Sequence, residues 1–395
     1  LESKVVLSNV AVSDSLFFKL MGRTSVTIRN KISLFGHNRY LSWCIGELAR
    51  TTERIDICFN GYTSQEIKQI HKNIKKIPRK SIQVNAREIH AKEDGICFLP
   101  KLFSGVDGYS PDIFLTHTKK EHIEEFLKEV NNLSLIGKVK RLALTENAIQ
   151  ALPKLKLHEG NKMDMLSLEI ARHSKNISEI LKTENNSIWL RNVRGLELKK
   201  HAVEILPKLK LHEENEMDVL SLCADRSEHI TGIFKTERNS IWMGKTKKLK
   251  LEDYAVEILP KLRIHEENML DVLVLNANHP RNVKEILKRR GYYYRFWMGN
   301  GDRSLFVGKV KNLILEGHAV KILPMLDFHR ENEMEELVLN AYKDTHTTGI
   351  HKTKKKSIWM GKVRKVSLEG CAEKIRGKLD FVPIAKGVPE ENEGS

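Results

Sequence analysis

The stretch that decides the fold runs from Ser240 to Asn278 and reads SIWMGKTKKLKLEDYAVEILPKLRIHEENMLDVLVLNAN. Most of the remaining chain repeats this stretch. An internal repeat of this length sets the architecture, so it is considered before any other pattern. Clear copies begin at Ser187 and Ser304, fainter copies at Ser25, Ser81 and Ser134, and a final half copy at Ser357.

Each copy contains two short alternations of apolar and polar residues. In the Ser240 copy they centre on Leu249 and Leu251 and on Leu273 and Leu275. Alternation with a period of two predicts strands. The intervening YAVEILPKL has apolar residues at helical spacing, and Pro260 is expected to stop that helix after roughly two turns. One copy therefore predicts a strand, a short helix, a second strand, and a short helix or turn.

The spacing of the predicted strands provides an independent test of the repeat. Successive steps between the first positions of the LxxLxL patterns are 24, 29, 24, 30, 24, 29, 24, 40, 24 and 29 residues. The short and long steps alternate with one exception, so the unit is a pair of repeats of about 53 residues. The first positions are Ala86, Ser110, Val139, Met163, Val193, Met217, Thr246, Leu270, Val310, Met334 and Val363.

The segment LDVLVLNAN, from Leu270 to Asn278, fits LxxLxLxxN, and at this point the chain resembles the leucine-rich repeat family. The resemblance implies an α/β solenoid of about fourteen units, with a parallel β-sheet on its concave face and short helices or turns on its convex side. We expect diverged repeats over 1–80, regular paired repeats over 81–380 and a polar tail over 381–395. Such a fold favours protein–protein recognition, because stacked repeats form an extended surface.

Composition adds limits on compartment and partners. The chain has 395 residues, a formal net charge of +16 and five scattered cysteines. The odd number of cysteines argues against a disulfide framework and favours a reducing compartment such as the cytoplasm, while sequons at Asn132, Asn176 and Asn185 leave secretion open. The first residue is Leu1, so we interpret the sequence as a processed chain or an excerpt. No apolar run approaches the roughly 20 residues of a membrane span.

No motif predicts catalysis, a cofactor or a metal site, and we expect the chain not to be an enzyme. The His-Glu pairs at His158, His212 and His265 recur at one repeat position. Copies two strands apart are separated by about 10 Å. Zinc ligands must lie about 2.0–2.2 Å from one ion. These histidines are therefore predicted to lie in solvated loops.

Charged residues alternate in sign at the second position of the LxxLxL pattern. Neighbouring parallel strands lie about 4.8 Å apart, so each cation is expected to lie beside an acid. The pattern predicts a ladder that fixes strand register, and a mixed-charge surface for a protein partner is the alternative. The row comprises Lys140, Asp164, Arg194, Asp218, Lys247, Asp271, Lys311, Glu335 and Arg364.

An apolar or aromatic pair precedes each strand that follows a long step. Because aromatic side chains dominate core energetics, we interpret these pairs as a packing spine under the sheet or on the convex side, in preference to a stripe of ligand-binding residues. The pairs are Leu135–Ile136, Ile188–Trp189, Ile241–Trp242, Leu305–Phe306 and Ile358–Trp359.

Basic residues cluster in the loops before several copies. The cluster before Ser357 contains Lys352, Lys354, Lys355 and Lys356, and is expected to form a basic rim. Binding of nucleic acid or another polyanion such as a ribonucleoprotein is therefore the alternative function. A third hypothesis is that the chain is the targeting half of a larger enzyme or receptor.

The single 40-residue step contains about eleven extra residues, in or beside KRRGYYYRFWMGNGDR at 288–303. Insertions in repeat proteins often map to a binding face, and aromatic residues with Arg are enriched in binding hot spots. We therefore predict a partner-binding element in this insertion, as an alternative to a purely structural role. Its residues are Tyr292, Tyr293, Tyr294, Arg295 and Trp297.

Overall fold

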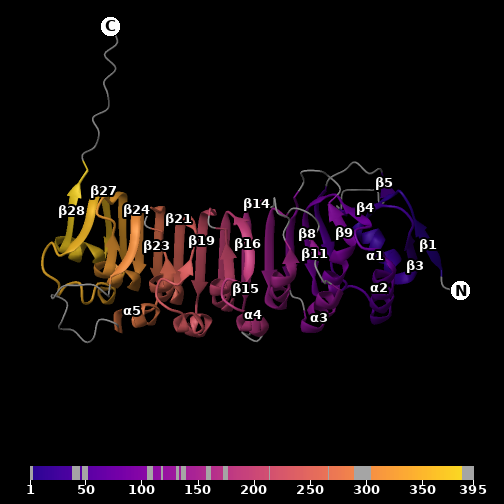
Figure 1. The fold of residues 1–395 in the computed structure, drawn as a ribbon, viewed down its shortest axis with the longest axis horizontal. Coiled ribbons are helices and arrows are strands. Elements are labelled where there is room, and N and C mark those ends of the chain that lie inside the picture. Colours follow the sequence, from indigo (N-terminus) through magenta and orange to yellow (C-terminus); the bar gives the residue numbers. More distant parts are fainter. Residues whose placement is uncertain are drawn as a thin grey trace, which may run out of the picture. The chain divides into compact units, whose positions relative to one another are not determined.

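The computed structural model describes residues 3–37, 45–46, 52–104, 110–116, 119–129, 133–134, 139–156, 162–171, 177–212, 214–265, 267–288 and 304–384. The chain divides into two compact units, Leu1–His212 and Glu213–Ser395, which we call the N-terminal and C-terminal units. Both contain a parallel sheet and short helices, so the α/β class is confirmed (Figure 1). The predicted insertion residues Tyr292–Tyr294, Arg295 and Trp297 lie outside the described residues.

The main sheet of the N-terminal unit is built from one strand of each half-repeat. Its strands are parallel and follow the chain order. Each strand buries alternate apolar side chains, as the period-two pattern predicted. The strands are β6 (Thr52–Ile57), β8 (Ala86–Lys92), β10 (Asp112–Thr116), β12 (Arg141–Thr145), β15 (Met165–Ile170) and β17 (Gly195–Lys200).

The first hundred residues also form smaller sheets around two helices. Strand β1 (Lys4–Leu7) pairs with β3 (Ser25–Ile28). Strands are present around Val5, Ile32 and Ile55 in these diverged repeats. A five-stranded sheet has the order β5 (Ile45–Gly46), β2 (Ala11–Ser13), β4 (Ile32–Phe35), β7 (Ile82–Val84) and β9 (Leu102–Ser104), with only the β2–β5 pair antiparallel. The shorter strands are β11 (Leu133–Ser134), β13 (Leu155–Lys156), β14 (Lys162–Met163), β16 (Ile188–Val193) and β18 (Leu209–Leu211).

The basic segment before Pro78 forms helix α2 (Ser64–Lys76). Thr63 and Glu66 form a capping box that starts it. The buried Asn73 accepts the Val26 N–H at 3.0 Å and thereby fastens the helix to the neighbouring sheet. The other helices of this unit are α1 (Asp14–Arg23), α3 (Lys120–Glu129), α4 (Ser178–Lys182) and the 3-10 helices η1 (Glu93–Lys101), η2 (Glu146–Lys154) and η4 (His201–Lys208).

The C-terminal unit repeats the same arrangement with longer strands. Leucines at the fourth and sixth pattern positions are fully buried in β21, β23, β24 and β26. Burying one such side chain stabilises the fold by about 1.5–3 kcal/mol. The parallel main sheet contains β19 (Glu216–Ala224), β21 (Lys245–Asp253), β23 (Met269–Ala277), β24 (Leu305–Gly317), β26 (Glu333–Ala341), β27 (Ile358–Gly370) and β28 (Leu379–Pro383).

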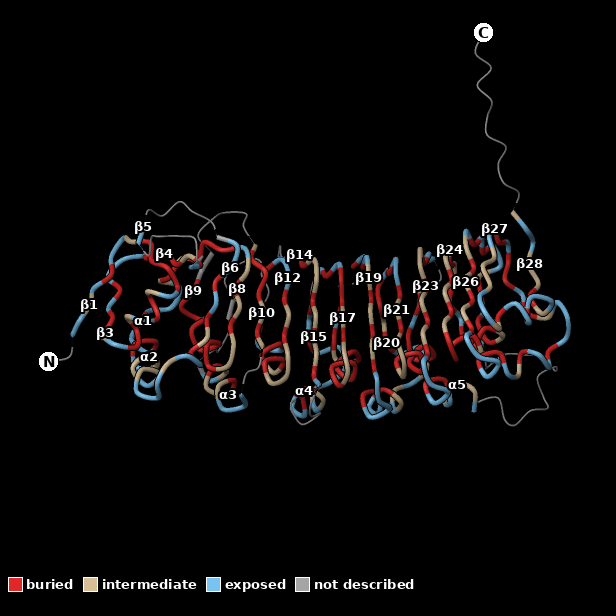
Figure 2. Tube along the Cα trace, turned by 180° about the vertical axis from the view of Figure 1, so that it is seen from behind, coloured by how far each residue is buried: buried red, intermediate tan, exposed pale blue. Residues whose placement is uncertain are grey.

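Short strands and helices connect the main strands. The strands β20 (Ile241–Trp242) and β22 (Leu262–Arg263) pair with each other, and β25 (Leu326–Phe328) pairs with the start of β24. The buried residues follow the strands in Figure 2 and also line the helices that join them. The helices are α5 (Lys284–Lys288), η5 (Ser227–Ile230), η6 (Ile233–Lys235), η7 (Tyr254–Lys261), η8 (Pro280–Val283), η9 (His318–Met325), η10 (Asp344–His346) and η11 (Cys371–Lys378).

The helix predicted in YAVEILPKL forms, but it is a 3-10 helix and Pro260 lies inside it rather than stopping it. The residue before it, Asp253, has φ 54° and ψ −127°. Gly317 takes the same conformation before η9, at φ 61° and ψ −132°. A backbone with positive φ favours glycine, so this sharp turn between strand and helix strains the copies that carry a side chain there.

A buried asparagine closes the turn that leads into the next main strand. Asn268 is 6% exposed, and its side chain accepts the Thr246 N–H at 3.1 Å and donates to the Thr246 carbonyl at 3.0 Å. Asn332 accepts the Val310 N–H at 2.7 Å in the next copy. These bonds join adjacent strands and explain why the loop sequence HEEN or HREN accompanies the strand pattern.

Candidate functional site

The main sheet of the C-terminal unit has one face packed on the core and one face that we call the open face. Residues at the third, fifth and seventh pattern positions point to the open face, and almost all of them are partly exposed. Strand register aligns the fifth positions into one row. That row reads Ser221, Lys250, Val274, Ile314, Val338 and Ser367.

The centre of this row is apolar. Val274 is opposite Ile314, and Ile314 is opposite Val338, on three adjacent strands. Val272 lies two residues before Val274 on the same face and extends the group. We call these four residues the apolar strip. A β-branched side chain left partly exposed in the middle of a sheet is a candidate contact for another molecule, because its burial would remove apolar surface from water.

Polar residues around the apolar strip pair with one another. The Lys250 ammonium lies 2.9 Å from a Glu252 carboxylate oxygen, and the Lys365 ammonium lies 2.7 Å from Glu336. Ser367 donates to the same Glu336 oxygen at 3.0 Å. An apolar centre with a polar, partly solvated rim is the usual anatomy of a protein–protein interface.

The open face of the N-terminal unit differs at the same positions. Its fifth-position row is Asp56, His90, Phe114, Ala143, Ser167 and Glu197. The His90 and Phe114 rings stack with centroids 4.3 Å apart, and Ser167 donates to Glu197 at 2.8 Å. Most of this row is polar and internally bonded, so it lacks an apolar strip like that of the C-terminal unit.

The predicted charge ladder is present in part, as ion pairs within each unit. Lys247 lies 2.8 Å from Asp218, and Lys311 lies 2.8 Å from Asp271. In the N-terminal unit, Asp164 lies 3.9 Å from both Lys140 and Arg194. Hydrogen bonding to Asp218 raises the pKa of Lys247. These side chains are well exposed, so each pair contributes little to stability.

The predicted aromatic packing spine is wrong in orientation. In each described pair the aliphatic residue is buried and the aromatic residue points outward: Ile358 is 4% exposed, whereas Trp359 is 50% exposed. Phe306 is 39% exposed beside the buried Leu305. Adjacent strand residues face opposite sides, so only one of each pair can reach the core.

The His-Glu motif caps a turn at the surface. His265 Nδ1 accepts the Glu267 N–H at 3.1 Å, and His329 Nδ1 accepts the Glu331 N–H at 3.2 Å. Both histidines are partly exposed, as the predicted loop position requires, but their rings also bond to the backbone. This bond to the backbone of the turn explains why a histidine recurs at the same position of each copy.

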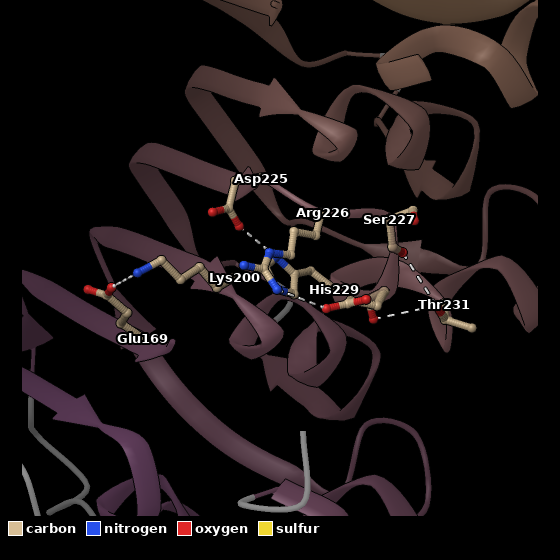
Figure 3. Close-up of polar contacts among 8 residues, drawn as sticks. Glu169, Lys200, Asp225, Arg226, Ser227, His229 and Thr231 are labelled. Atoms are coloured by element: carbon tan, nitrogen blue, oxygen red, sulfur yellow. Dashed lines mark hydrogen bonds and ion pairs between the residues drawn. The ribbon is translucent and has the colours of Figure 1, made fainter. Parts of the chain in front are cut away.

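Another histidine lies in η5, shortly after the end of β19, as Figure 3 shows. His229 is 2% exposed, and its Nδ1 lies 3.0 Å from an Asp225 carboxylate oxygen. The Thr231 hydroxyl lies 3.3 Å from the Ser227 carbonyl and 3.4 Å from the Glu228 carbonyl. These contacts within one turn fix the connection from β19 to η5.

A buried lysine at the end of the ILPKL segment is a structural residue that the sequence patterns did not reveal. Lys261 is 5% exposed, and its ammonium donates to the carbonyls of Phe234, at 3.1 Å, and of Thr236. Lys378 donates to the Thr353 carbonyl at 2.6 Å in the last copy. The signal that could have identified it is a cation fixed at one position inside an apolar segment.

The basic rim lies in an exposed loop before β27. Lys352, Lys354, Lys355 and Lys356 are all exposed, and Lys356 has φ 51°. Its N–H donates to the Gly377 carbonyl at 3.1 Å, which anchors the end of the loop. The placement agrees with the predicted exposed loop, and the binding of a polyanion there stays a prediction.

A second basic region is found in the N-terminal unit, at a hollow of about 520 Å³. Arg29, Lys31 and Lys80 contribute three cationic side chains to its lining, and no acidic residue is among the described residues that line it. Asn30 is oriented by a 3.0 Å hydrogen bond to Ser8. The full lining is Asn9, Ile28, Arg29, Asn30, Lys31, Pro78, Lys80 and Ser81.

No family model, curated protein or solved structure matches the chain. Among the helices that the structure describes, none has both the length and the apolar character needed to cross a bilayer.

Proposed function

We propose that the chain is a leucine-rich repeat type of scaffold that recognises a protein through the open face of its C-terminal unit. The observation that carries the proposal is the apolar strip, in which Val274, Ile314 and Val338 occupy the same position on three adjacent strands. The repeat spacing and the parallel strands support a solenoid, whose stacked repeats provide extended binding surfaces. The mutually paired rim supports a protein partner over a polyanion, because its acids would repel phosphate.

The test is a substitution in the centre of the strip. Ile314→Lys adds a charge to a partly exposed position and should leave the fold intact while removing the partner. The matched control is Ser167→Lys, at the fifth position of a strand in the N-terminal unit. Proteins captured by the wild-type chain and by Ser167→Lys, but not by Ile314→Lys, would support the proposal. Capture that is unchanged by Ile314→Lys, or abolished by nuclease, would refute it.

A second candidate function is binding of a phosphate-bearing polyanion by the N-terminal hollow. Arg29, Lys31 and Lys80 surround the hollow, and phosphate contacts of this kind make affinity fall steeply with salt. Combined Arg29→Ala and Lys80→Ala substitutions should reduce the salt dependence of RNA binding by about 0.7 per lost single-strand contact. Replacing Lys354 and Lys355 with Ala tests the basic rim separately. RNA binding that neither pair of substitutions alters would exclude both surfaces.

A further inference from the structure

The outward-facing aromatic residues of the C-terminal unit form a row with a fixed repeat. Trp242, Phe306 and Trp359 occupy the same position of successive copies, each next to a buried aliphatic residue. Phe306 is 39% and Trp359 is 50% exposed, and Trp242 is partly exposed. Large rings that the core does not need, repeated at one surface position, indicate a binding function.

Charged residues alternate with these rings across the paired strands. Trp242 is opposite Arg263, and the guanidinium carbon of Arg263 lies 5.5 Å from the centroid of the Trp242 ring. Phe306 is opposite Asp327, which has no ion-pair partner among the described residues. The last pair is Trp359 with Asp380. In chain order the three pairs are aromatic with cation, aromatic with anion, and aromatic with anion, and these charges are not those of a phosphate-binding stripe.

The spacing of the rings restricts the ligand. Trp242 precedes β21, Phe306 lies in β24 and Trp359 lies in β27, with one main strand between successive members. Two strand spacings correspond to about 9.6 Å. A polyproline II helix has three residues per turn and a rise of about 3.1 Å per residue, which gives about 9.3 Å per turn. Every third residue of such a segment would face successive rings.

We propose that this aromatic row binds a polyproline II segment of a partner protein, with a proline on each of Trp242, Phe306 and Trp359. An acidic residue between the first two prolines faces Arg263, and a basic residue between the next two faces Asp327. The carbonyls of a polyproline II segment have no internal partners, and the tryptophan indole N–H groups can donate to them. Proline-rich segments dock on aromatic grooves in this way because they lose little conformational entropy on binding.

The test uses synthetic peptides and the full chain. Pro-Glu-Ala-Pro-Lys-Ala-Pro-Lys and its reversed sequence, each with a fluorescent label, cover the two possible chain directions. At least one should bind, as followed by fluorescence anisotropy. The longer peptide Pro-Glu-Ala-Ala-Pro-Lys-Ala-Ala-Pro-Lys, whose prolines are four residues apart, should bind roughly tenfold more weakly, because its prolines fall out of step with the aromatic row. Equal binding of the two spacings would overturn the proposal.

Variants locate the binding on the row. Phe306→Ala and Trp359→Ala should each weaken binding by about tenfold, as expected for an aromatic contact residue. Tyr342→Ala removes another exposed aromatic residue of the unit and is the matched control, which should bind normally. Ile314→Lys should also bind normally, so failure here is separable from failure of the proposed sheet-face function. Unchanged binding by both row variants would overturn the proposal.

A charge exchange tests the register of the peptide. Asp327→Lys should weaken binding of the original peptide and restore binding of one in which the facing lysine is replaced by glutamate. Failure of this exchange in both peptide directions would contradict the assigned pairing. Displacement of the bound peptide by single-stranded oligouridine that itself stacks on Trp359 would instead identify a nucleic-acid site, and would likewise overturn the proposal.

Discussion

Two successive copies in the C-terminal unit, residues 246–283 and 310–347, have the same sequence of elements but different internal chemistry. Both retain the buried leucines, the buried asparagine and the histidine that caps a turn. At three helix positions, however, the second copy changes charge or polarity. Tyr254 corresponds to His318, Glu257 to Lys321 and Lys261 to Met325.

This difference separates residues that build the repeat from residues that adapt to local neighbours. The strand and turn residues bond to the backbone of adjacent strands, so their role is the same in each copy. The helix residues contact the segment that follows or precedes them, and that segment differs between copies. Lys261 bonds carbonyls 25 and 27 residues before it, whereas the corresponding residues before Met325 lie outside the described part of the chain.

The largest loss of stability is expected from replacing the buried asparagine that both copies retain. Asn268→Ala would leave the buried Thr246 N–H and carbonyl without their partner, and should lower the free energy of unfolding by roughly 2–5 kcal/mol. Asn332→Ala should cost less, because Asn332 bonds Val310 through one side-chain atom, and its Nδ2 meets no acceptor among the described residues. Urea unfolding measures the loss of stability in both variants. A larger loss for Asn332→Ala would contradict this interpretation of the two turns.

The glutamate of the first copy should make stability depend on pH. Burial raises the pKa of Glu257 to about 7, and its carboxylate accepts the Glu285 N–H at 2.7 Å. The folded state therefore keeps a proton that the unfolded state releases near pH 4.5. Stability should fall as pH rises from about 4.5 to 7, by up to about 3 kcal/mol.

Glu257→Gln keeps an acceptor oxygen and removes this titration. The variant should be more stable than the wild type at pH 8 and indistinguishable from it at pH 4. Glu285→Gln is the control, because it changes the neighbouring carboxylate but leaves the N–H donor. Equal pH dependence in the wild type and Glu257→Gln would show that Glu257 is not the titrating group.

The second copy should respond to pH in the opposite direction. His318 is 5% exposed, its ring centroid lies 4.4 Å from that of His346, and burial lowers the pKa of His318 to about 4. Lys321 and Lys343 also lower it by repulsion. Between about pH 4 and 6.5 the ring is neutral in the folded state and charged in the unfolded state, so stability should fall as pH decreases from 6.5 towards 4, by up to about 3 kcal/mol.

Replacing the histidine with the residue of the first copy tests this expectation. His318→Tyr should flatten the acid limb of the stability profile, measured by urea unfolding at half-unit intervals between pH 4 and 7. His329→Gln is a control on a partly exposed histidine of the same copy. The interpretation is refuted if the acid limb keeps its slope in His318→Tyr.

Lys261, which the second copy lacks, should contribute less to stability than the buried groups above. Lys261→Met introduces the residue found at 325 and removes the donor to two carbonyls, with an expected loss of about 2 kcal/mol. Lys378→Met removes the donor to one carbonyl, that of Thr353, and should cost about half as much. Thermal unfolding of both variants gives the comparison, and equal or reversed losses would contradict the carbonyl-capping role.

The sequence predicted the strands, their spacing and the charge ladder, because these depend on alternation and on register, which residue patterns record directly. It did not predict the 3-10 form of the ILPKL helix, because apolar spacing over two turns is similar for both helix types. The outward direction of Trp359 was also missed, since an Ile-Trp pair offers two apolar candidates for one core position. The apolar strip around Ile314 was visible only after strand register placed three residues from separate copies together.

The smallest effect on stability is expected from the charge ladder. Lys247 of the first copy lies between Asp218 and Asp271, and Lys247→Glu would place three acids on adjacent strands. The net charge of +16 complicates the test, because any added acid relieves overall repulsion. Lys355→Glu in the exposed rim makes the same change in net charge and is the control. We expect a lower urea midpoint for Lys247→Glu than for this control, and a smaller difference at high salt because ions screen exposed charges.

Adding Asp218→Lys and Asp271→Lys to Lys247→Glu restores alternation and should recover part of the loss. Identical midpoints for the two single variants would show that the alternating row does not fix register.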